Sequence, residues 1–270
     1  MKKLVSFNVN GIRSRPHQLA ALTERLAPDL IGIQESKVAD DAFPHQAIEA
    51  LGYRAQIHGQ KGHYGVALLS REAPLRIDKG FPGDEADAQR RSITGFFADG
   101  DDQIVVINGY FPQGESRNHP IKFPGKQRFY ADLLGYLREC FSPNQNLVVM
   151  GDMNVAPLDL DIGIGDDNAR RWLRTGKCSF LPEERAWLRA ITDWGLFDAY
   201  RVVHPEADDC FSWFDYRSRG FERDPKRGLR IDLILISAPL KERLRGAGID
   251  YGIRALQKPS DHCPVWIELS

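Results

Sequence analysis

Short apolar runs, many of them rich in β-branched residues, recur along the chain and predict strands of a buried core. The runs lie at 4–7, 30–33, 66–69, 104–107, 147–150, 231–236 and 265–269. Several show no alternation of apolar and polar side chains, which indicates strands that are covered on both faces. These segments are therefore expected to form the interior of one or more layered sheets.

Helical periodicity appears between the predicted strands. Pro16 opens the first such segment, which carries Leu19, Leu22 and Leu26 on one face and ends before Pro28. Two more helices are predicted at 129–140 and 183–194. Strands with helices between them indicate an α/β or α+β core. Because no repeat, low-complexity tract or Pro/Gly/Ser-rich linker divides the chain, residues 1–270 are expected to form one domain.

Composition places the chain among ordinary globular proteins. Of its 270 residues 42% are hydrophobic and 27% charged, and no apolar stretch approaches the roughly 18 residues of a membrane-spanning helix. The run at 4–7 is too short for the apolar part of a signal peptide. The four cysteines lie far apart, which predicts neither a zinc site nor a disulfide framework. We therefore expect a cytoplasmic protein with reduced thiols.

Charge is balanced in total but unevenly distributed. Lys and Arg number 36 against 37 Asp and Glu, so the formal net charge is −1. Basic residues dominate the stretch from Arg217 to Arg230, which adjoins and overlaps a run of aromatic residues from Phe211 to Phe221. Basic side chains neutralise phosphates and aromatic rings stack on bases, so this stretch is a candidate nucleic-acid interface. A solvated loop beside ordinary core aromatics would have the same composition.

Polar residues follow the apolar strands, where a site on an α/β scaffold is commonly built. In chain order these strand ends carry Asn8-Val9-Asn10, Gln34-Glu35, Asn108-Gly109-Tyr110, Gly151-Asp152-Met153-Asn154, Asp232 and Ser260-Asp261-His262. Singly, each has a structural alternative, because Asp and Asn suit turns and His can cap a loop. Together they supply oxygen ligands, amides and one imidazole. Hard oxygen ligands suit Mg²⁺ or Mn²⁺ rather than zinc, and a cation with a His near arginines predicts phosphodiester chemistry.

Three competing motifs fail on their spacing. Gly163-Ile164-Gly165 lacks the third glycine of a dinucleotide fingerprint. Asp159-Leu160-Asp161 begins like a calcium loop, but Arg170 stands where the closing Glu belongs. Ser260, Asp261 and His262 are adjacent and cannot fold onto one another as a catalytic triad. These exclusions leave the strand-end residues as the candidate site.

The strand-end motifs resemble the endonuclease/exonuclease/phosphatase superfamily. The motifs are Ser6-Phe7-Asn8-Val9-Asn10-Gly11, Gln34-Glu35-Ser36-Lys37, Asn108-Gly109-Tyr110-Phe111-Pro112, Gly151-Asp152-Met153-Asn154, Leu229-Arg230-Ile231-Asp232 and Ser260-Asp261-His262-Cys263-Pro264. Four further stretches, at 59–65, 113–117, 172–177 and 211–217, resemble its abasic-site endonuclease family of DNA-repair enzymes. The resemblance runs through essentially the whole chain in order.

This resemblance implies a fold and an activity. The fold is a four-layer α/β/β/α sandwich, with two facing mixed β-sheets flanked by helices and the active site at one edge. The activity is Mg²⁺-dependent hydrolysis of double-stranded DNA, with Mn²⁺ as an expected substitute: incision 5′ to an abasic site, 3′→5′ exonuclease action, and removal of 3′ phosphates or sugar fragments. The expected partners are duplex DNA, abasic sites and 3′ ends. We expect a monomer that is associated with the nucleoid through DNA and does not contact a membrane.

The resemblance also assigns roles around a metal ion. Glu35 would hold the metal, with Asn8 supporting the site. Asp152 would position and activate water, helped by Asn154, and Asp261 would be a ligand to metal-bound water. In full, the residues expected around the metal are Asn8, Glu35, Asp152, Asn154, Asp261 and His262.

For catalysis, the resemblance implies that His262 stabilises the phosphate or acts as acid/base. Asp232 would orient its imidazole, because a carboxylate that binds one ring nitrogen fixes the tautomer of the other. Tyr110 would contact the phosphate. The expected catalytic residues are thus Tyr110, Asp152, Asn154, Asp232 and His262.

Two sets of residues are expected at the DNA. The first would contact the backbone and consists of Arg91, Gln113, Lys122, Arg174 and Lys177. The second, Trp213, Leu229 and Ile231, matches positions that line the family's abasic pocket. A sugar without its base costs little to extrude from the stack, so such a pocket would admit it and exclude a normal nucleotide. These three residues could instead belong to the core.

One departure and two rival hypotheses remain. A human abasic endonuclease has an aspartate where this chain has Asn10, so the number and affinity of metal ions do not carry over from it.

The first rival hypothesis is another phosphoesterase of the superfamily, acting on inositol phosphates, lipids or RNA tails. The second is a DNA-binding protein without catalysis, against which every expected catalytic position holds a competent residue.

Overall fold

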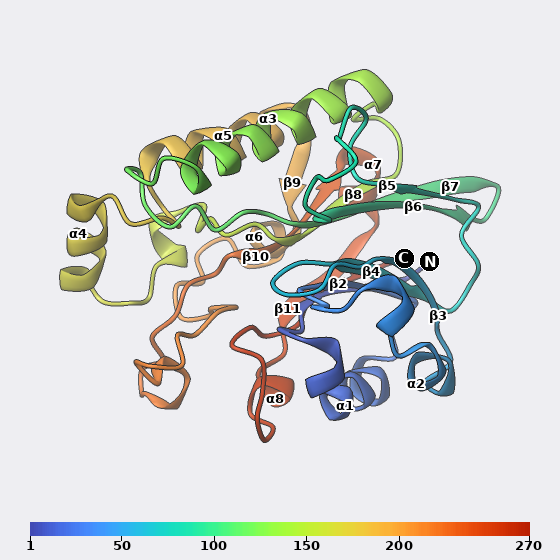
Figure 1. The fold of residues 1–270 in the computed structure, drawn as a ribbon, viewed down its shortest axis with the longest axis horizontal. Helices are drawn as coiled ribbons and strands as arrows, with labels where there is room; N and C mark the ends of the chain where they lie inside the picture. The colour runs from blue at the N-terminus through green and yellow to red at the C-terminus, as the bar shows by residue number, and fades with distance from the viewer.

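Two six-stranded β-sheets form the centre of the computed structural model, which describes residues 1–270 (Figure 1). In spatial order the first sheet consists of β11 (Leu244–Ile249), β12 (Val265–Leu269), β1 (Lys3–Asn8), β2 (Leu30–Gln34), β4 (Val66–Ser70) and β3 (Arg54–His58). The second consists of β5 (Arg76–Lys79), β6 (Ser92–Asp99), β7 (Asp102–Tyr110), β8 (Leu147–Asp152), β10 (Asp232–Ser237) and β9 (Leu196–Asp198). Each sheet has one parallel pair, β1 with β2 and β7 with β8, so both sheets are mixed.

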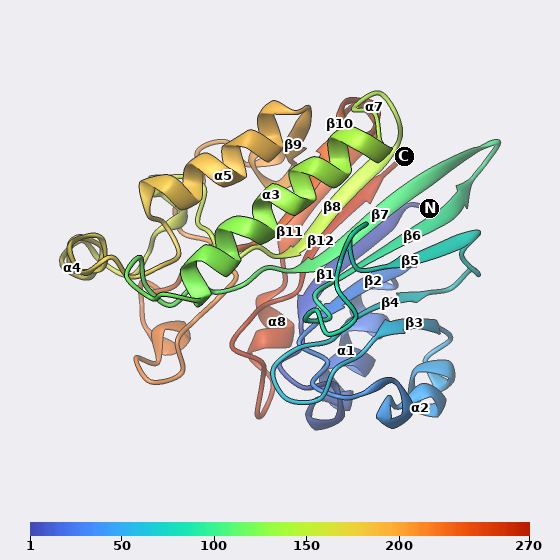
Figure 2. The same ribbon diagram turned by 45° about the horizontal axis from the view of Figure 1, so that its top comes forward.

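Helices cover the outer faces of both sheets (Figure 2). On the first sheet lie α1 (Pro16–Leu26), α2 (His45–Ala50) and α8 (Tyr251–Arg254). On the second lie α3 (Lys122–Cys140) and α5 (Pro182–Asp193), which run side by side. The remaining helices are α4 (Asp166–Thr175), α6 (Ala199–Val203) and α7 (Ala238–Arg243). None of the helices has the length and apolar character needed to cross a membrane.

Three apolar layers hold this arrangement together, one between the sheets and one under each set of helices. Strand β8 shows how the sequence builds them, because neighbouring side chains of a strand point to opposite faces. Val148 and Met150 pack between the sheets, whereas Leu147 and Val149 pack against the helices of the second sheet. This confirms the predicted four-layer α/β/β/α sandwich.

The predicted elements are present, with one helix longer than expected. Every apolar run predicted as a strand lies in a strand, and the helices at 16–26 and 183–194 correspond to α1 and α5. The helix predicted at 129–140 begins earlier, at Lys122. Pro124 falls in its first turn, where backbone N–H groups have no partner within the helix. His119 replaces the missing partner, because its Nδ1 accepts hydrogen bonds from the N–H groups of Ile121 and Lys122.

Candidate active site

Strand pairing brings the polar strand ends to one place. In the second sheet Asp152 lies opposite Tyr110 on β7 and opposite Asp232 on β10. In the first sheet Asn8, at the end of β1, hydrogen-bonds to Asp152, so the two sheets meet there. His262, which precedes β12, joins the group through its hydrogen bond to Asp232. The site therefore lies where the ends of both sheets converge.

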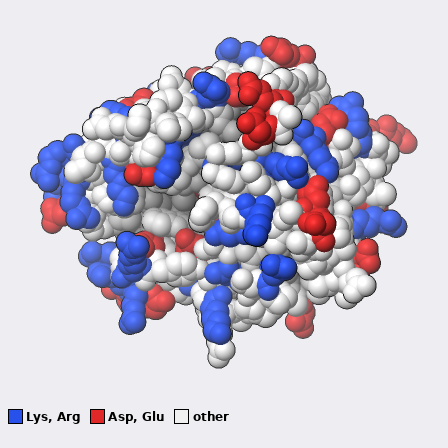
Figure 3. All heavy atoms as spheres, in the orientation of Figure 1, with Lys and Arg blue, Asp and Glu red and all other residues white.

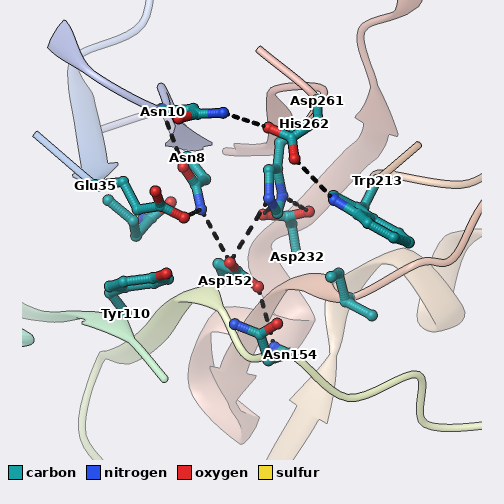
Figure 4. A network of polar contacts seen from close by, with 12 residues as sticks. Asn8, Asn10, Glu35, Tyr110, Asp152, Asn154, Trp213, Asp232, Asp261 and His262 are labelled. Carbon is teal, nitrogen blue, oxygen red and sulfur yellow. Dashed lines mark hydrogen bonds and ion pairs between the residues drawn. The ribbon is translucent and has the colours of Figure 1, made fainter. Parts of the chain in front are cut away.

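An imidazole lies between two buried carboxylates at the floor of the site (Figure 4). His262 Nδ1 lies 2.9 and 3.0 Å from the two carboxylate oxygens of Asp232. On the other side of the ring, Nε2 lies 3.8 Å from Oδ2 of Asp152. The hydroxyl of Ser212 donates to Asp232 Oδ2 at 2.7 Å and fixes that carboxylate in turn. The ring is thus oriented with its Nε2 toward Asp152.

Asp152 and His262 influence each other's pKa: the carboxylate raises the pKa of the imidazole, and the imidazole lowers the pKa of the carboxylate. Burial alone would lower the pKa of His262, but the carboxylates of Asp232 and Asp152 outweigh it and raise that pKa to about 10. Burial raises the pKa of Asp152 to about 7, with Asp232 and Glu35 adding to the rise and His262 opposing it. His262 is therefore protonated at neutral pH, and Asp152 is poised to take up or release a proton.

Two carboxylates and the imidazole offer a candidate cation site. One ligand atom from each of Glu35, Asp152 and His262 lies within 4.8 Å of the others. Asn8 Nδ2 donates to Glu35 Oε1 and Asp152 Oδ2, each at 2.9 Å, and so holds the two carboxylates together. Lys37 Nζ lies 2.8 Å from the other oxygen of Glu35. Paired carboxylates with an amide beside them fit a hard cation such as Mg²⁺.

Asn154 supports Asp152 through its backbone. Its N–H donates to Asp152 Oδ1 at 3.1 Å, while its side-chain Nδ2 donates to the carbonyl of Phe111 at 3.0 Å. The residue has φ of +54°, in the left-handed region that few residues other than glycine adopt. The chain is therefore held in a sharp turn directly after β8, with the Asp152 carboxylate in a fixed orientation.

Asp261 lies beside the site and its carboxylate is fully engaged. Oδ1 accepts from Asn10 Nδ2 at 2.8 Å, and Oδ2 accepts from the indole N–H of Trp213 at 3.0 Å. Burial alone would raise the pKa of Asp261, but His262 and these two hydrogen bonds outweigh it and lower the pKa. Of the residues predicted around a metal, Glu35, Asp152 and His262 thus form the cluster. Asn8 and Asn154 hydrogen-bond to it directly, whereas Asp261 is linked to it through Asn10, whose N–H donates to Asn8 Oδ1.

Tyr110 and Trp213 lie on opposite sides of the cluster (Figure 4). Burial, together with the charges of Glu35 and Asp152, raises the pKa of Tyr110 well above its usual value, so its hydroxyl stays protonated. The guanidinium of Arg91 lies 4.8 Å from the ring centre of Tyr110. On the Tyr110 side a hollow of about 360 Å³ contains three of the residues that were predicted to contact DNA: Arg91, Gln113 and Lys122.

A second hollow, of about 220 Å³, opens on the Trp213 side and is rich in cations. Lys177 lines it, with its Nζ 3.7 Å from the ring centre of Trp172. The other basic side chains that line it are Arg171, Arg223 and Arg227. Figure 3 shows Lys and Arg gathered over α4 and over the loop that contains residues 217–227, on the rim of a hollowed face. Arg174 is exposed on α4 and lies outside both hollows.

Leu229 and Ile231 are buried, with exposed fractions of 0% and 3%. They form a small apolar cluster with Ala156 and Phe180, against which Trp213 packs. The structure therefore brings the three residues of the predicted abasic pocket together as one contiguous apolar group. Of the three, only Trp213 lines a hollow.

Some positioning residues were missed, and two strand-end residues do not reach the site. Lys37 and Ser212 hold Glu35 and Asp232 in place, but neither stood out in sequence beyond lying in a quoted motif. Gln34 and Asn108 are fully buried and bind each other at 2.6 Å, between the two sheets. They connect β2 with β7 rather than face a cleft.

Comparisons with known proteins agree with this geometry. Residues 5–262 match the Endonuclease/Exonuclease/phosphatase family. The chain is 58% identical over 266 residues to Exodeoxyribonuclease III of Haemophilus influenzae, which covers 98% of this chain and 99% of that protein. A 3′ phosphatase from Neisseria, solved with a product DNA hairpin, superposes with a TM-score of 0.90 at 35% identity. An AP endonuclease from Archaeoglobus fulgidus superposes with a TM-score of 0.90 at 32% identity, and both structures cover 100% of each chain.

These relatives confirm the family resemblance that the motifs predicted. The match spans the chain from β1 to His262, and it includes the strand ends that build the site. Each relative carries the name of an enzyme that cleaves phosphate esters of DNA. The chain therefore belongs to the Endonuclease/Exonuclease/phosphatase family, as a phosphodiester hydrolase of the DNA-repair nuclease type.

Proposed function

We propose that this protein is a Mg²⁺-dependent nuclease of double-stranded DNA that incises 5′ to abasic sites, shortens 3′ ends and removes 3′ phosphates. The observation that carries the proposal is the buried Asp232–His262–Asp152 group beside Glu35, with a hollow on either side in which basic side chains outnumber acidic ones. Anionic DNA on both sides of a hydrolytic centre fits this distribution of charge. Incision 5′ to an abasic site, shortening of a 3′ end and removal of a 3′ phosphate all break a bond between phosphorus and O3′. One site that hydrolyses this bond can therefore perform all three reactions.

In this mechanism each side chain has one task. The Asp152 carboxylate, fixed by the N–H of Asn154, orients a water molecule and accepts its proton. His262, protonated and held by Asp232, donates its Nε2–H to the charge that develops on the phosphate oxygens. The neutral hydroxyl of Tyr110 donates to the same phosphate. As the water oxygen bonds to phosphorus and its proton passes to Asp152, the P–O3′ bond breaks, and the departing 3′ oxygen takes a proton from solvent water.

The cluster of Glu35 and Asp152, tied by Asn8, would hold a divalent cation. When bound, Mg²⁺ polarises the phosphate and offsets charge on its oxygens, and Mn²⁺ has the same ligand preferences. A protonated imidazole offers no lone pair at Nε2, so His262 suits contact with the phosphate better than ligation of the metal. Asp261, bound to Asn10 and Trp213, would act through water.

Selectivity for abasic sites would reside at Trp213. Its ring packs on the apolar cluster of Leu229 and Ile231 and borders the cationic hollow, so it presents an apolar face next to phosphate-binding groups. A deoxyribose without a base has the same combination, an apolar sugar face flanked by two phosphates. Arg91, Gln113 and Lys122 would contact the backbone on the Tyr110 side, and Lys177 and Arg174 on the other. We place the enzyme in the cytoplasm, on the nucleoid DNA, as a monomer.

The test of this proposal compares two substrates in one variant. Trp213→Ala is expected to slow incision of an abasic duplex by about 10-fold or more, because burying a large apolar side chain, here against the sugar, contributes about 1.5–3 kcal/mol. Removal of a 3′ phosphate should change far less, since it does not require the pocket. Trp213→Phe, which keeps an aromatic ring and loses the hydrogen bond to Asp261, serves as the matched variant. An equal loss on both substrates would contradict the assignment of the pocket.

A further inference from the structure

Lys126, on the second turn of α3, is fully buried and lies outside the catalytic group. Its ammonium has three acceptors, matching its three protons. They are Glu184 Oε1 on α5 at 2.5 Å, the carbonyl of Asn154 at 2.8 Å and the carbonyl of Gln113 at 3.3 Å. Glu184 is also fully buried, and its other oxygen accepts from the N–H of Leu181 at 2.8 Å. The pair is therefore completely satisfied in the interior.

The two carbonyls belong to the two loops that carry the site. Asn154 lies in the turn after β8, whose N–H fixes Asp152. Gln113 lies in the segment after β7, three residues beyond Tyr110. One turn further along α3, the hydroxyl of Tyr130 donates to the carbonyl of Met153 at 2.8 Å. Helix α3 thus holds successive carbonyls of the Asp152 turn. Lys126 also joins that turn to the Gln113 segment, in addition to the hydrogen bonds that Phe111 makes with Asp152 and Asn154.

Stability does not require this lysine to be charged. Taking an ammonium and a carboxylate out of water costs about as much as their attraction returns, and an apolar pair of the same size is often as stable. The charge does supply three directed hydrogen bonds at a fixed point. Asn154 needs such a hold, because its φ of +54° is a conformation that a non-glycine residue keeps only when its surroundings impose it.

We infer that Lys126 is a positioning residue for the nuclease reaction: its ammonium fixes the turn at Asn154, and through it the Asp152 carboxylate, relative to the Tyr110 side of the site. The inference rests on the proposed function. Glu184 anchors the ammonium from α5, so the two outer helices of the second sheet determine the geometry of the catalytic turn. Lys126 itself touches neither DNA nor the reacting atoms.

The experiment measures kcat and KM for cleavage of a duplex, with urea unfolding of the same preparations. Lys126→Met is expected to lower kcat by about 10- to 100-fold, since a displacement of about 1 Å at a reacting group has an effect of that size. KM should change little, because the DNA-contacting surfaces are untouched. Arg138→Met, on the exposed face of the same helix, is the matched control and should match wild type in kcat, in KM and in urea unfolding.

A double variant separates positioning from folding. Lys126→Met leaves the buried Glu184 without its cation and is expected to be destabilised, whereas Lys126→Met with Glu184→Met should recover most of the lost urea midpoint, because no unpaired charge remains in the interior. The kcat of the double variant should nevertheless stay low, because the carbonyls of Asn154 and Gln113 still lack the hydrogen bonds of the Lys126 ammonium. A double variant with wild-type stability and wild-type kcat would overturn the inference. A wild type that cleaves no duplex would overturn the proposed function, and this inference with it.

Discussion

At the scale of single residues, the site depends on the mutual influence of Asp152 and His262. The carboxylate is buried beside other carboxylates, which raises its pKa, and the imidazole lies between two of them, which raises its pKa as well. At neutral pH the site therefore contains both a charged donor and a base that can accept a proton. Neither property belongs to an isolated Asp or His in water.

We predict that Asp152→Asn and His262→Asn will each lower the turnover of cleavage by about 10²-fold or more, the usual contribution of a positioned acid or base. Asp152→Asn preserves the shape of the side chain, His262→Asn removes the ring, and neither residue lines the two hollows, so duplex binding should remain close to wild type. Single-turnover cleavage with fluorescence anisotropy for binding checks both statements. Wild-type turnover in either variant would remove that residue from the mechanism.

Metal affinity is predicted to rise with pH. Asp152 must lose its proton to bind a cation, and burial with its neighbours raises its pKa to about 7. Below that pH the cation displaces a proton, so the Mg²⁺ concentration that gives half-maximal rate should fall by up to about tenfold per pH unit, and then level off above pH 7. Titrations of Mg²⁺ at pH 5.5, 6.5, 7.5 and 8.5 measure this. A half-saturation that is constant across the series would contradict the assignment of Asp152.

The candidate residues could be found in the sequence because they lie at the ends of apolar strands. Asp152 is the last residue of β8 and Asp232 is the first residue of β10. Their partners could not be found in this way: Ser212 is 20 residues from Asp232 along the chain, and only the tertiary fold brings them into contact. Gln34 and Asn108 also lie near strand ends, but they are not part of the site. Their side-chain amides are buried and hydrogen-bond to each other between the two sheets.

At the scale of secondary-structure elements, a buried arginine fixes the start of β10. The guanidinium of Arg230 lies 2.6 Å from Asp161 Oδ1 and 2.6 Å from Asp198 Oδ2, and only 1% of the side chain is exposed. The residue thus joins the loop at 159–161 to the segment that leads into Asp232. Burial alone would lower the pKa of Arg230, but the two carboxylates outweigh it and raise that pKa.

We predict that Arg230→Met will lower the free energy of unfolding by about 3–5 kcal/mol, because it removes the buried cation that Asp161 and Asp198 share and leaves Asp161 with Arg201 as its only cation and Asp198 with backbone N–H groups alone. Urea unfolding at neutral pH measures the change. Arg223→Met, at an exposed position of the same basic segment, is the matched control and should lie within about 0.5 kcal/mol of wild type. A change for Arg230→Met as small as that of the control would show that the network does not stabilise the fold.

Most of the strands that sequence patterns predicted are buried on both faces. β2 and β8 are mostly apolar because a sheet or a helix layer covers each side. β3 was not predicted, because it is an edge strand whose side chains are all at least partly exposed. β6 was not predicted although it is buried, because Ser, Thr and Gly interrupt its apolar residues. None of the residues of α4 is buried, and its few apolar residues lie among charged ones.

At the scale of the whole molecule, the site exists only because the two sheets pack on each other. Asn8 and Glu35 come from the first sheet and its β2 end, whereas Asp152 and Asp232 come from the second. One apolar layer fills the space between the sheets and draws on strands of both. That the chain folds as one domain stays a prediction, and this shared layer is its physical basis.

The overall charge gave no indication of a DNA partner, because the formal net charge is only −1. In the structure, basic side chains outnumber acidic ones in the two hollows beside the site. The hollow beside Trp213 has Lys177, Arg171, Arg223 and Arg227 against Asp215, and the hollow beside Tyr110 has Arg91, Lys122 and Arg128 against Asp84 and Asp132. The distribution, rather than the total, therefore determines which polyanion the molecule can hold.

The most direct test of the central proposal is cleavage of an end-labelled duplex with one abasic site, run beside an undamaged duplex, with Mg²⁺ and with EDTA. Mg²⁺-dependent incision immediately 5′ to the lesion is predicted, with slower 3′→5′ shortening of the undamaged duplex and no product in EDTA. Folded protein that cleaves neither duplex with Mg²⁺ or Mn²⁺ would contradict the proposal. Hydrolysis of a phosphoinositide by the same protein would then assign the site to a different phosphate ester.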